Sequence, residues 1–157
     1  MHVVLLEPEI PPNTGNVARL CAATHSVLHL VEPFGFRLDD AQLRRAGMDY
    51  WQQVRWHRWP NWTAFETACL SPAGTRYWFV ESGGPRRYTE AQFLEDDYLV
   101  FGRETAGLPP ALLKAHHDRW LRIPMFNPAS RSLNLSNCVA LVLFEALRQL
   151  QFPGDLG

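Results

Sequence analysis

The apolar positions of the chain are densest close to its C-terminal end. Between Cys138 and Leu147 only Glu145 is polar, and this run is too long for an ordinary strand, so it predicts a helix. Polar residues at 134–137 stand in front of it and can cap the free N–H groups of its first turn. A helix with almost no polar face needs cover on both sides. We expect one side to pack on the chain's own sheet and the other on a second copy of the protein.

Upstream of this helix, short apolar runs alternate with helix-capping residues and with turns rich in Gly and Pro. The pattern predicts strands at 3–6, 27–31, 77–80, 98–101 and 120–123, with an extended segment at 50–56. It also predicts helices that begin at Asn13 or Thr14, at Asp39 or Asp40, at Asn61 and at 108–110. This alternation is typical of an α/β domain with a mostly parallel sheet flanked by helices. With no linker or internal repeat in the sequence, we expect one domain over residues 1–157.

Length and composition narrow the class of protein. A chain of 157 residues, with 46% hydrophobic and 20% charged residues, suits one globular core. No apolar run reaches the 18 residues of a membrane span and the chain starts without a basic leader, so we expect a cytoplasmic protein with no membrane partner. The scattered Cys21, Cys69 and Cys138 are typical of reduced thiols and not of a disulfide framework.

Charge gives a weaker indication of a nucleic-acid partner. The net charge of −1 argues against a generic nucleic-acid binder, yet of the 15 basic residues only Lys114 is lysine. Arginine forks onto phosphate and stacks on bases, but a genomic bias toward arginine explains the count equally well. The basic residues are densest among tryptophans: Arg37, Arg44, Arg45, Arg55 and Arg58, with Trp51, Trp56, Trp59 and Trp62. Such a zone either binds looped RNA by stacking or is a surface arginine cluster over core tryptophans.

Ligands of a parallel α/β sheet gather at the carboxyl ends of its strands. Four loops meet that condition, those after Leu6, Val80, Phe101 and Ile123. Residues 13–19 bring Asn and Arg side chains that either point into a ligand cleft or form a helix cap with a surface arginine. Residues 101–108 offer glycine backbone and Glu104 as an acceptor, and residues 123–131 form a rigid loop with two prolines. Since neither GxGxxG nor GxxxxGK[ST] is present, we expect no NAD or ATP site.

Three smaller groups have structural explanations that we prefer to functional ones. The pair His116-His117 has no partner at metal-ligand spacing, so we expect no metal site. Cys21 lies on the apolar side of a predicted helix and is expected in the core. Asp96-Asp97 is expected to cap or solvate the start of the strand at 98–101.

Taken together, three of these stretches resemble the motifs of the SPOUT class of RNA methyltransferases. The matching residues are 13–16 with Arg19, then Phe101-Gly102 with Glu104 and Gly107-Leu108, then Ile123-Pro124-Met125 followed by 132–137. Further runs at 7–16, 39–40, 43–50 and 145–150 make the chain similar to the small, single-domain tRNA wobble-nucleotide 2′-O-methyltransferases (TrmL type). The resemblance covers nearly the whole chain, and its motifs are specific in combination but not singly.

The resemblance implies a fold, a cofactor and partners. The fold would be an α/β sheet whose C-terminal part forms a deep trefoil knot, an exception to the rule that chains do not thread themselves. S-adenosylmethionine would lie bent in the knot, and the tRNA anticodon loop would lie across both subunits of a homodimer. The implied cofactor-binding residues are Val80, Gly102, Glu104, Gly107, Ile123, Met125, Ser132 and Asn134.

The implied reaction transfers a methyl group from S-adenosylmethionine to the ribose 2′-hydroxyl of the wobble nucleotide, a cytidine or modified uridine. Arg19, with Asn13, is implied as catalytic. Because a guanidinium is not an ordinary base, we expect Arg19 to fix the hydroxyl and stabilise developing negative charge, while a substrate phosphate or water takes the proton. The implied RNA-binding residues are Arg44, Arg45, Asn16 and Arg131. Two alternatives stay open: a methyltransferase for another tRNA or rRNA ribose, and a non-catalytic RNA-binding dimer of the same fold.

Three positions depart from the family's pattern. Glu81-Ser82 stands where a pair of threonines is expected and puts a carboxylate close to the cofactor loop. Gln42 stands where an arginine is common, and Phe144 replaces a tyrosine in the final helix. We expect these departures to change substrate affinity more than activity.

Overall fold

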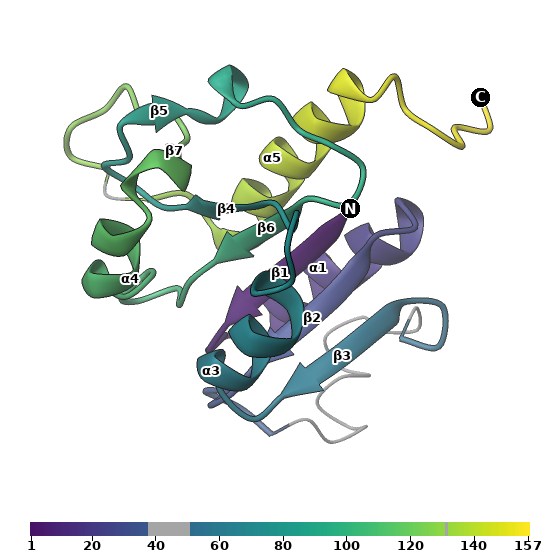
Figure 1. The fold of residues 1–157 in the computed structure, drawn as a ribbon, viewed down its shortest axis with the longest axis horizontal. Coiled ribbons are helices and arrows are strands. Elements are labelled where there is room, and N and C mark those ends of the chain that lie inside the picture. The colour runs from purple at the N-terminus through teal and green to yellow at the C-terminus, as the bar shows by residue number, and fades with distance from the viewer. Residues whose placement is uncertain (38–50, 131) are drawn as a thin grey trace.

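Seven strands form one parallel sheet in the described part of the chain. The structure is a computed structural model, and it describes residues 1–37, 51–130 and 132–157. The strands are β1 (His2–Leu6), β2 (Val27–Val31), β3 (Arg55–Trp59), β4 (Tyr77–Val80), β5 (Arg86–Arg87), β6 (Tyr98–Phe101) and β7 (Trp120–Arg122). Their order is β3-β2-β1-β6-β4-β7-β5, and every neighbouring pair is parallel (Figure 1). The predicted α/β class is confirmed.

Helices cover both faces of this sheet. The longer ones, α1 (Pro11–Ala23) and α5 (Leu135–Gln149), pack against each other on one face (Figure 1). The other face is covered by α3 (Trp62–Phe65), the π-helical turn η1 (Glu66–Leu70) and α4 (Pro110–Ala115). Short 3-10 turns, η2 (Tyr88–Glu90) and η3 (His117–Arg119), complete the described helices. The deep knot that the resemblance implies stays a prediction.

Burial of β1 on both faces explains its unbroken apolar sequence. Val3 and Leu5 pack into the core under α1 and α5, whereas Val4 and Leu6 pack with Phe65 on the opposite face. A strand covered on both sides reads as a continuous hydrophobic run instead of alternating with polar residues.

The start of α1 differs from the prediction. We expected Asn13 or Thr14 to cap this helix, but it begins at Pro11, after Ile10, and has no side-chain cap. Proline is favoured in a first turn because its missing N–H would have no helical partner there. Asn13 and Thr14 therefore lie buried inside the first turn, where the amide of Asn13 can bond to other segments.

The closing helix α5 agrees with its prediction. Asn134 caps it, because its Oδ1 accepts a hydrogen bond from the Ser136 backbone N–H at 2.9 Å. One side of α5 is buried in the core, but Leu141 and Phe144 are 43% and 48% exposed. The cover expected for this second side, another copy of the protein, stays a prediction.

Other expectations had mixed outcomes. The extended segment expected at 50–56 is displaced, because residues 51–53 form a turn and β3 pairs with β2 only from Arg55 onward. Asn61 caps α3 as predicted, accepting from Ala64 N at 2.9 Å. The helix predicted from Asp39 or Asp40, together with Arg44, Arg45 and Arg131, lies outside the described residues. No helix of the described residues is both long and apolar enough to cross a membrane.

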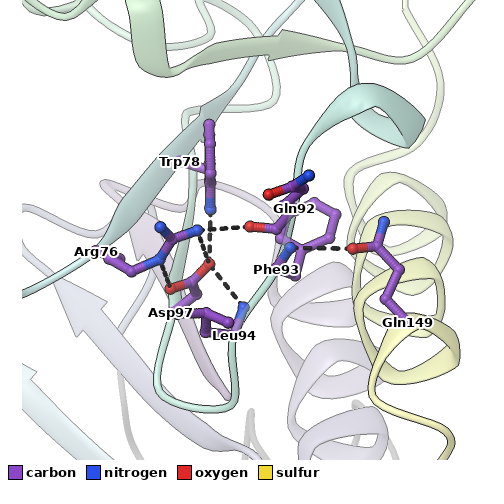
Figure 2. A network of polar contacts seen from close by, with 7 residues as sticks. All are labelled: Arg76, Trp78, Gln92, Phe93, Leu94, Asp97 and Gln149. Atoms are coloured by element: carbon purple, nitrogen blue, oxygen red, sulfur yellow. Dashed lines mark hydrogen bonds and ion pairs between the residues drawn. The ribbon is translucent and has the colours of Figure 1, made fainter.

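A buried carboxylate organises the amino ends of the strands. Asp97 is 1% exposed and accepts from Arg76 Nε at 2.9 Å and from Trp78 Nε1 at 2.8 Å. It also accepts from the Leu94 backbone N–H at 3.1 Å (Figure 2). The same turn is tied to α5, since Phe93 N donates to Gln149 Oε1 at 3.0 Å (Figure 2). Asp97 therefore fixes the segment that leads into β6, by accepting hydrogen bonds from residues around the start of that strand.

Three histidines lie in a row across neighbouring strands, His2 on β1, His29 on β2 and His57 on β3. Trp59 Nε1 donates to His29 Nδ1 at 3.1 Å, so His29 Nε2 carries the hydrogen and donates to His2 Nδ1 at 3.0 Å. Burial lowers the pKa of His29 to about 3 and the pKa of His2 to about 4. Both rings are consequently neutral in the folded protein at neutral pH.

We predict that the folded protein loses stability as the pH falls from about 6.5 toward 4. The unfolded chain protonates these two imidazoles near their ordinary pKa of 6.5, whereas the folded chain keeps them neutral down to about 4 and 3. Unfolding therefore takes up protons in this window, and each proton adds about 1.4 kcal/mol per pH unit to the slope. The free energy of unfolding in urea, measured from pH 4.5 to 7.5, checks this.

His29→Gln should flatten that slope, because the amide oxygen can still accept from Trp59 but does not titrate. The matched control is His117→Gln at an exposed position, which should leave the slope unchanged. A wild-type stability that does not vary with pH in this window would contradict the prediction.

Candidate functional site

A cavity of about 680 Å³ opens at the carboxyl ends of β6, β4 and β7. These strands are neighbours in the sheet, and Ile10 and Asn13 reach the cavity from the segment after β1, the next strand along. The four loops expected to carry the chemistry thus meet at one place. All eight residues that the resemblance implies for the cofactor line it: Val80, Gly102, Glu104, Gly107, Ile123, Met125, Ser132 and Asn134.

One side-chain amide connects three of these segments. Asn13 Nδ2, in the first turn of α1, donates to Glu104 Oε1 at 3.1 Å. Asn134 Nδ2, at the start of α5, donates to Asn13 Oδ1 at 2.9 Å. The three residues are far apart in the sequence, so this chain of hydrogen bonds joins the walls of the cavity.

Glu104 strengthens the connection between the loop after β6 and the start of α1. Its carboxylate accepts from Glu9 N at 2.8 Å and from Ile10 N at 3.2 Å, in addition to Asn13. In return, the Glu9 carboxylate accepts from Thr105 N and Thr105 Oγ1, both at 2.9 Å. Arg103 forms an ion pair with Glu7 in the same region. The two segments are therefore held by bonds in both directions.

The two glycines of residues 102–107 are required by close backbone approach. Arg103 and Gly107 exchange backbone hydrogen bonds of 3.2 and 2.9 Å, which folds the loop back on itself. A Cβ on Gly102 would lie 2.2 Å from the Gly107 carbonyl carbon. Gly107 has φ +65°, and a Cβ there would lie 2.0 Å from Glu81 Oε2. At position 102 no other residue type fits without moving the loop. At position 107 a side chain would have to displace the Glu81 carboxylate and adopt a positive φ that favours glycine.

Glu81, which departs from the family's pattern, is part of the cavity wall. Its Oε2 accepts from the Leu108 backbone N–H at 2.9 Å, so the residue after β4 holds the end of the loop after β6. Its Oε1 accepts from Ser82 N at 2.7 Å and from Ser82 Oγ at 3.0 Å. The carboxylate is half-buried and lies against the glycine loop.

The cysteines do not supply a nucleophile. Cys138 lines the cavity from the first turn of α5, where burial, with the Glu81 carboxylate as second cause, raises the pKa of its thiol to about 11. Cys21 is fully buried in the core, as expected, and burial raises its pKa to about 12. Thiols with such pKa values stay protonated at neutral pH and are poor nucleophiles.

The implied catalytic and RNA-binding residues are only partly brought together. Asn13 lines the cavity, but Arg19 and Asn16 lie on the exposed side of α1, three residues apart and thus neighbours on the helix surface. Arg44, Arg45 and Arg131 lie outside the described residues. The structure therefore describes the cavity at the strand ends more fully than a surface for RNA.

Several cavity residues were missed by the sequence reasoning. Leu135 and Cys138 are three residues, about one turn, apart at the start of α5, and this spacing directly after the Asn134 cap could have indicated them. Ile10 was missed because the start of α1 was placed too late. The remaining missed residues are Phe101, Arg103, Thr105, Ala106 and Leu133, all beside predicted ones.

No metal centre accompanies this cavity in the described residues, where no three His, Cys, Asp or Glu side chains gather as ligands would. His116 instead contacts Tyr77, with 3.4 Å between its Nδ1 and the tyrosine oxygen.

Comparison with known proteins identifies the class. A model of the SpoU rRNA Methylase family matches residues 1–144 of the 157. The chain belongs to the SpoU rRNA methylase family. A relative from Saccharophagus degradans, named tRNA (cytidine(34)-2'-O)-methyltransferase, is 51% identical, and the match covers 98% of this chain and 98% of that protein.

Solved structures share the fold of this SpoU-family chain. One, described as structural insights into the 2-OH methylation of C/U34 on tRNA, has a TM-score of 0.89 and 45% identity, and covers 96% of this chain and 95% of its own. The SpoU methyltransferase AviRb from Streptomyces viridochromogenes, solved in complex with AdoMet, is 26% identical with a TM-score of 0.79, over 96% of this chain and 60% of its own. The resemblance to RNA methyltransferases drawn from the motifs is confirmed.

We predict that Gly102→Ala destabilises this SpoU-family protein by about 1–3 kcal/mol, the usual cost of overpacking. The added methyl group would meet the Gly107 and Leu108 backbone at 2.2–2.4 Å, so the loop must shift. Chemical unfolding measures the change. Gly154→Ala is the comparison variant, because its methyl group meets no atom within 4 Å and only adds backbone strain at φ +82°, so Gly102→Ala should be the less stable of the two. Equal stability of the two variants would contradict the prediction.

Proposed function

We propose that this protein transfers a methyl group from S-adenosylmethionine to the ribose 2′-hydroxyl of the wobble nucleotide, position 34, of tRNA. The observation that carries the proposal is the near full-length agreement with a tRNA (cytidine(34)-2'-O)-methyltransferase at 51% identity. The cavity is consistent with it, because the residues that would hold the methyl donor line one connected wall. We place the activity in one domain, in the cytoplasm.

The cavity fits the proposed cofactor. Its volume of about 680 Å³ lies within the range of about 300–1,000 Å³ for sites of small ligands. Backbone groups of residues 102–107 and the polar side chains of Ser132 and Asn134 give the fixed donors and acceptors that an adenosine needs. When bound, S-adenosylmethionine supplies an activated methyl group on a sulfonium. The chain's own contribution is to hold the donor and align it with the ribose.

Arg19 is proposed to act on the ribose hydroxyl. It lies two turns after Asn13 on α1, the helix whose start forms a cavity wall. A guanidinium keeps its proton, so we assign it the roles of fixing the hydroxyl and stabilising the developing negative charge. The proton would go to a substrate phosphate or to water. Asn13 is proposed to hold the Glu104 loop and the start of α5 in the catalytic arrangement.

The RNA surface is proposed to need two copies of the chain. Leu141 and Phe144, three residues apart on α5, present an exposed apolar strip that a second copy would cover. Asn16 lies beside Arg19 on α1 and would contact the anticodon loop together with Arg44, Arg45 and Arg131.

A second candidate function is 2′-O-methylation of another tRNA or rRNA ribose. It is favoured by the family model, whose description refers to rRNA. Incubation with labelled S-adenosylmethionine and either bulk tRNA or rRNA, followed by mass spectrometry of the digested RNA, separates the candidates. A label at tRNA position 34 supports the proposal, and a label elsewhere supports the alternative. Donor binding without transfer to any RNA would favour the non-catalytic dimer.

We predict that Arg19→Ala lowers the rate of methyl transfer about 100-fold or more, the usual effect of removing one donor to a developing oxyanion. The dissociation constant for S-adenosylmethionine, measured by calorimetry, should change less than about twofold, because Arg19 does not line the cavity. Arg87→Ala, at an exposed arginine of β5, is the control and should keep the wild-type rate. Undiminished turnover by Arg19→Ala would remove Arg19 from the mechanism.

A further prediction concerns assembly. Phe144→Glu should convert a dimer into monomers in sedimentation velocity, because a charge placed in an apolar interface is costly to bury. Leu156→Glu, at a side chain that is 98% exposed in the C-terminal tail, should remain dimeric. A wild-type protein that is monomeric and active would contradict the proposed dimer.

A further inference from the structure

The cavity wall carries more acidic than basic side chains, and these side chains differ in their surroundings. Among the described lining residues, Glu81 and Glu104 are acidic and Arg103 is basic. The charge of Arg103 is matched by Glu7, with which it forms an ion pair. The two carboxylates therefore decide the electrostatic character of the wall.

Glu104 is compensated by its surroundings. It accepts hydrogen bonds from the backbone of Glu9 and Ile10 directly before α1, and from Asn13 in its first turn. The N-terminal end of a 13-residue helix carries a partial positive charge that offsets a carboxylate there. The negative charge of Glu104 is thus largely stabilised by groups of the protein itself.

Glu81 differs from Glu104 in where its donors lie. It also accepts three hydrogen bonds from neutral donors, Ser82 N, Ser82 Oγ and Leu108 N, but none of these belongs to the first turn of a long helix. Within the described residues no ion pair involves Glu81. Both oxygens only accept, which is the pattern of an ionised carboxylate with one of its about four acceptor sites left for a ligand. The carboxylate cannot rotate away freely, because Leu108 N and the Gly107 backbone fix it against the wall.

The charge of Glu81 reaches other groups in the cavity. Cys138 lines the cavity from α5, and after burial the Glu81 charge is the second cause that raises the pKa of its thiol. A negative charge that disfavours a thiolate there favours a cation in the same space. Because the wall is half-buried, the interaction is screened less than it would be in bulk water.

We propose that Glu81 is a specificity-determining residue, which selects the positively charged methyl donor over its neutral demethylated product. This inference rests on the proposed function. S-adenosylmethionine and S-adenosylhomocysteine share the adenosine and the amino-acid end, so the contacts to those parts cancel in the comparison. They differ in the methyl group and in the positive charge on sulfur. Glu81 therefore lowers the free energy of the donor complex and leaves the product complex nearly unchanged, which eases release of product after each turnover.

Calorimetric titration without RNA tests this directly. Wild-type protein should bind S-adenosylmethionine about five- to tenfold more tightly, relative to S-adenosylhomocysteine, than Glu81→Gln does. Glu81→Gln keeps the size of the side chain and an acceptor oxygen but removes the charge. Glu81→Asp keeps the charge and should keep most of the preference. Glu95→Gln, at an exposed glutamate near the amino ends of the strands, is the matched control.

Sinefungin separates charge from shape, because it carries an amine in place of the sulfonium. Its affinity should follow that of S-adenosylmethionine in both wild type and Glu81→Gln. Equal loss of all three ligands in Glu81→Gln would show that Glu81 only holds the Leu108 loop, and would overturn the inference. If Glu81→Gln does not fold, the wild-type ratio decides: equal affinity for donor and product also overturns it. A wild type that binds none of the three would instead overturn the proposed cofactor.

Discussion

The hydrogen-bonded chain from Glu104 through Asn13 to Asn134 is the constraint on which the cavity depends. Its bonds of 3.1 and 2.9 Å connect the loop after β6, the start of α1 and the start of α5. None of these segments is adjacent in sequence to another. Because a buried amide left without a partner costs about 1–3 kcal/mol, the three segments move together or not at all. The cavity is consequently a property of the whole fold and not of any one loop.

This connection explains why the chain tolerates an unusual wall. Glycines at 102 and 107 let the loop fold tightly, and Glu81 occupies the space that a side chain at position 107 would take. The loop is held from two sides, by Glu104 at its beginning and by Glu81 through Leu108 at its end. The same carboxylate that supports the loop also adds charge to the site, so support and selectivity come from one side chain.

Much of the fold followed from the sequence because its pattern was local. The runs at 3–6, 27–31, 77–80 and 98–101 are buried on both faces and read plainly as strands. The edge strand β3 could not be predicted as plainly, because Arg55 and His57 are exposed and the position of the strand is set by its pairing with β2. Asn13 was predicted to be a cap because asparagine serves both as a capping residue and as a buried hydrogen-bonding amide, and the sequence does not distinguish the two roles. The eight implied cofactor residues were named from family motifs and line the cavity, whereas Leu135 and Cys138 were not named and line it through the orientation of α5. The direction of Glu81 could not be predicted, because it depends on Gly107, which lies 26 residues later.

The strand order has a consequence for how the molecule forms. The first three strands of the chain, β1 to β3, are side by side, and the remaining four join them only where β6 pairs with β1. In this pairing of β1 with β6, His2 lies opposite Tyr98, so most of the polypeptide must exist before the two strands can pair. Contacts of such large sequence separation slow folding, because the loop between them must be closed first. The cavity takes its walls from both sides of this β1–β6 pairing and needs α5 as well, so it forms only after the two parts of the sheet have joined. Until then a chain emerging from the ribosome exposes the open edge of β1.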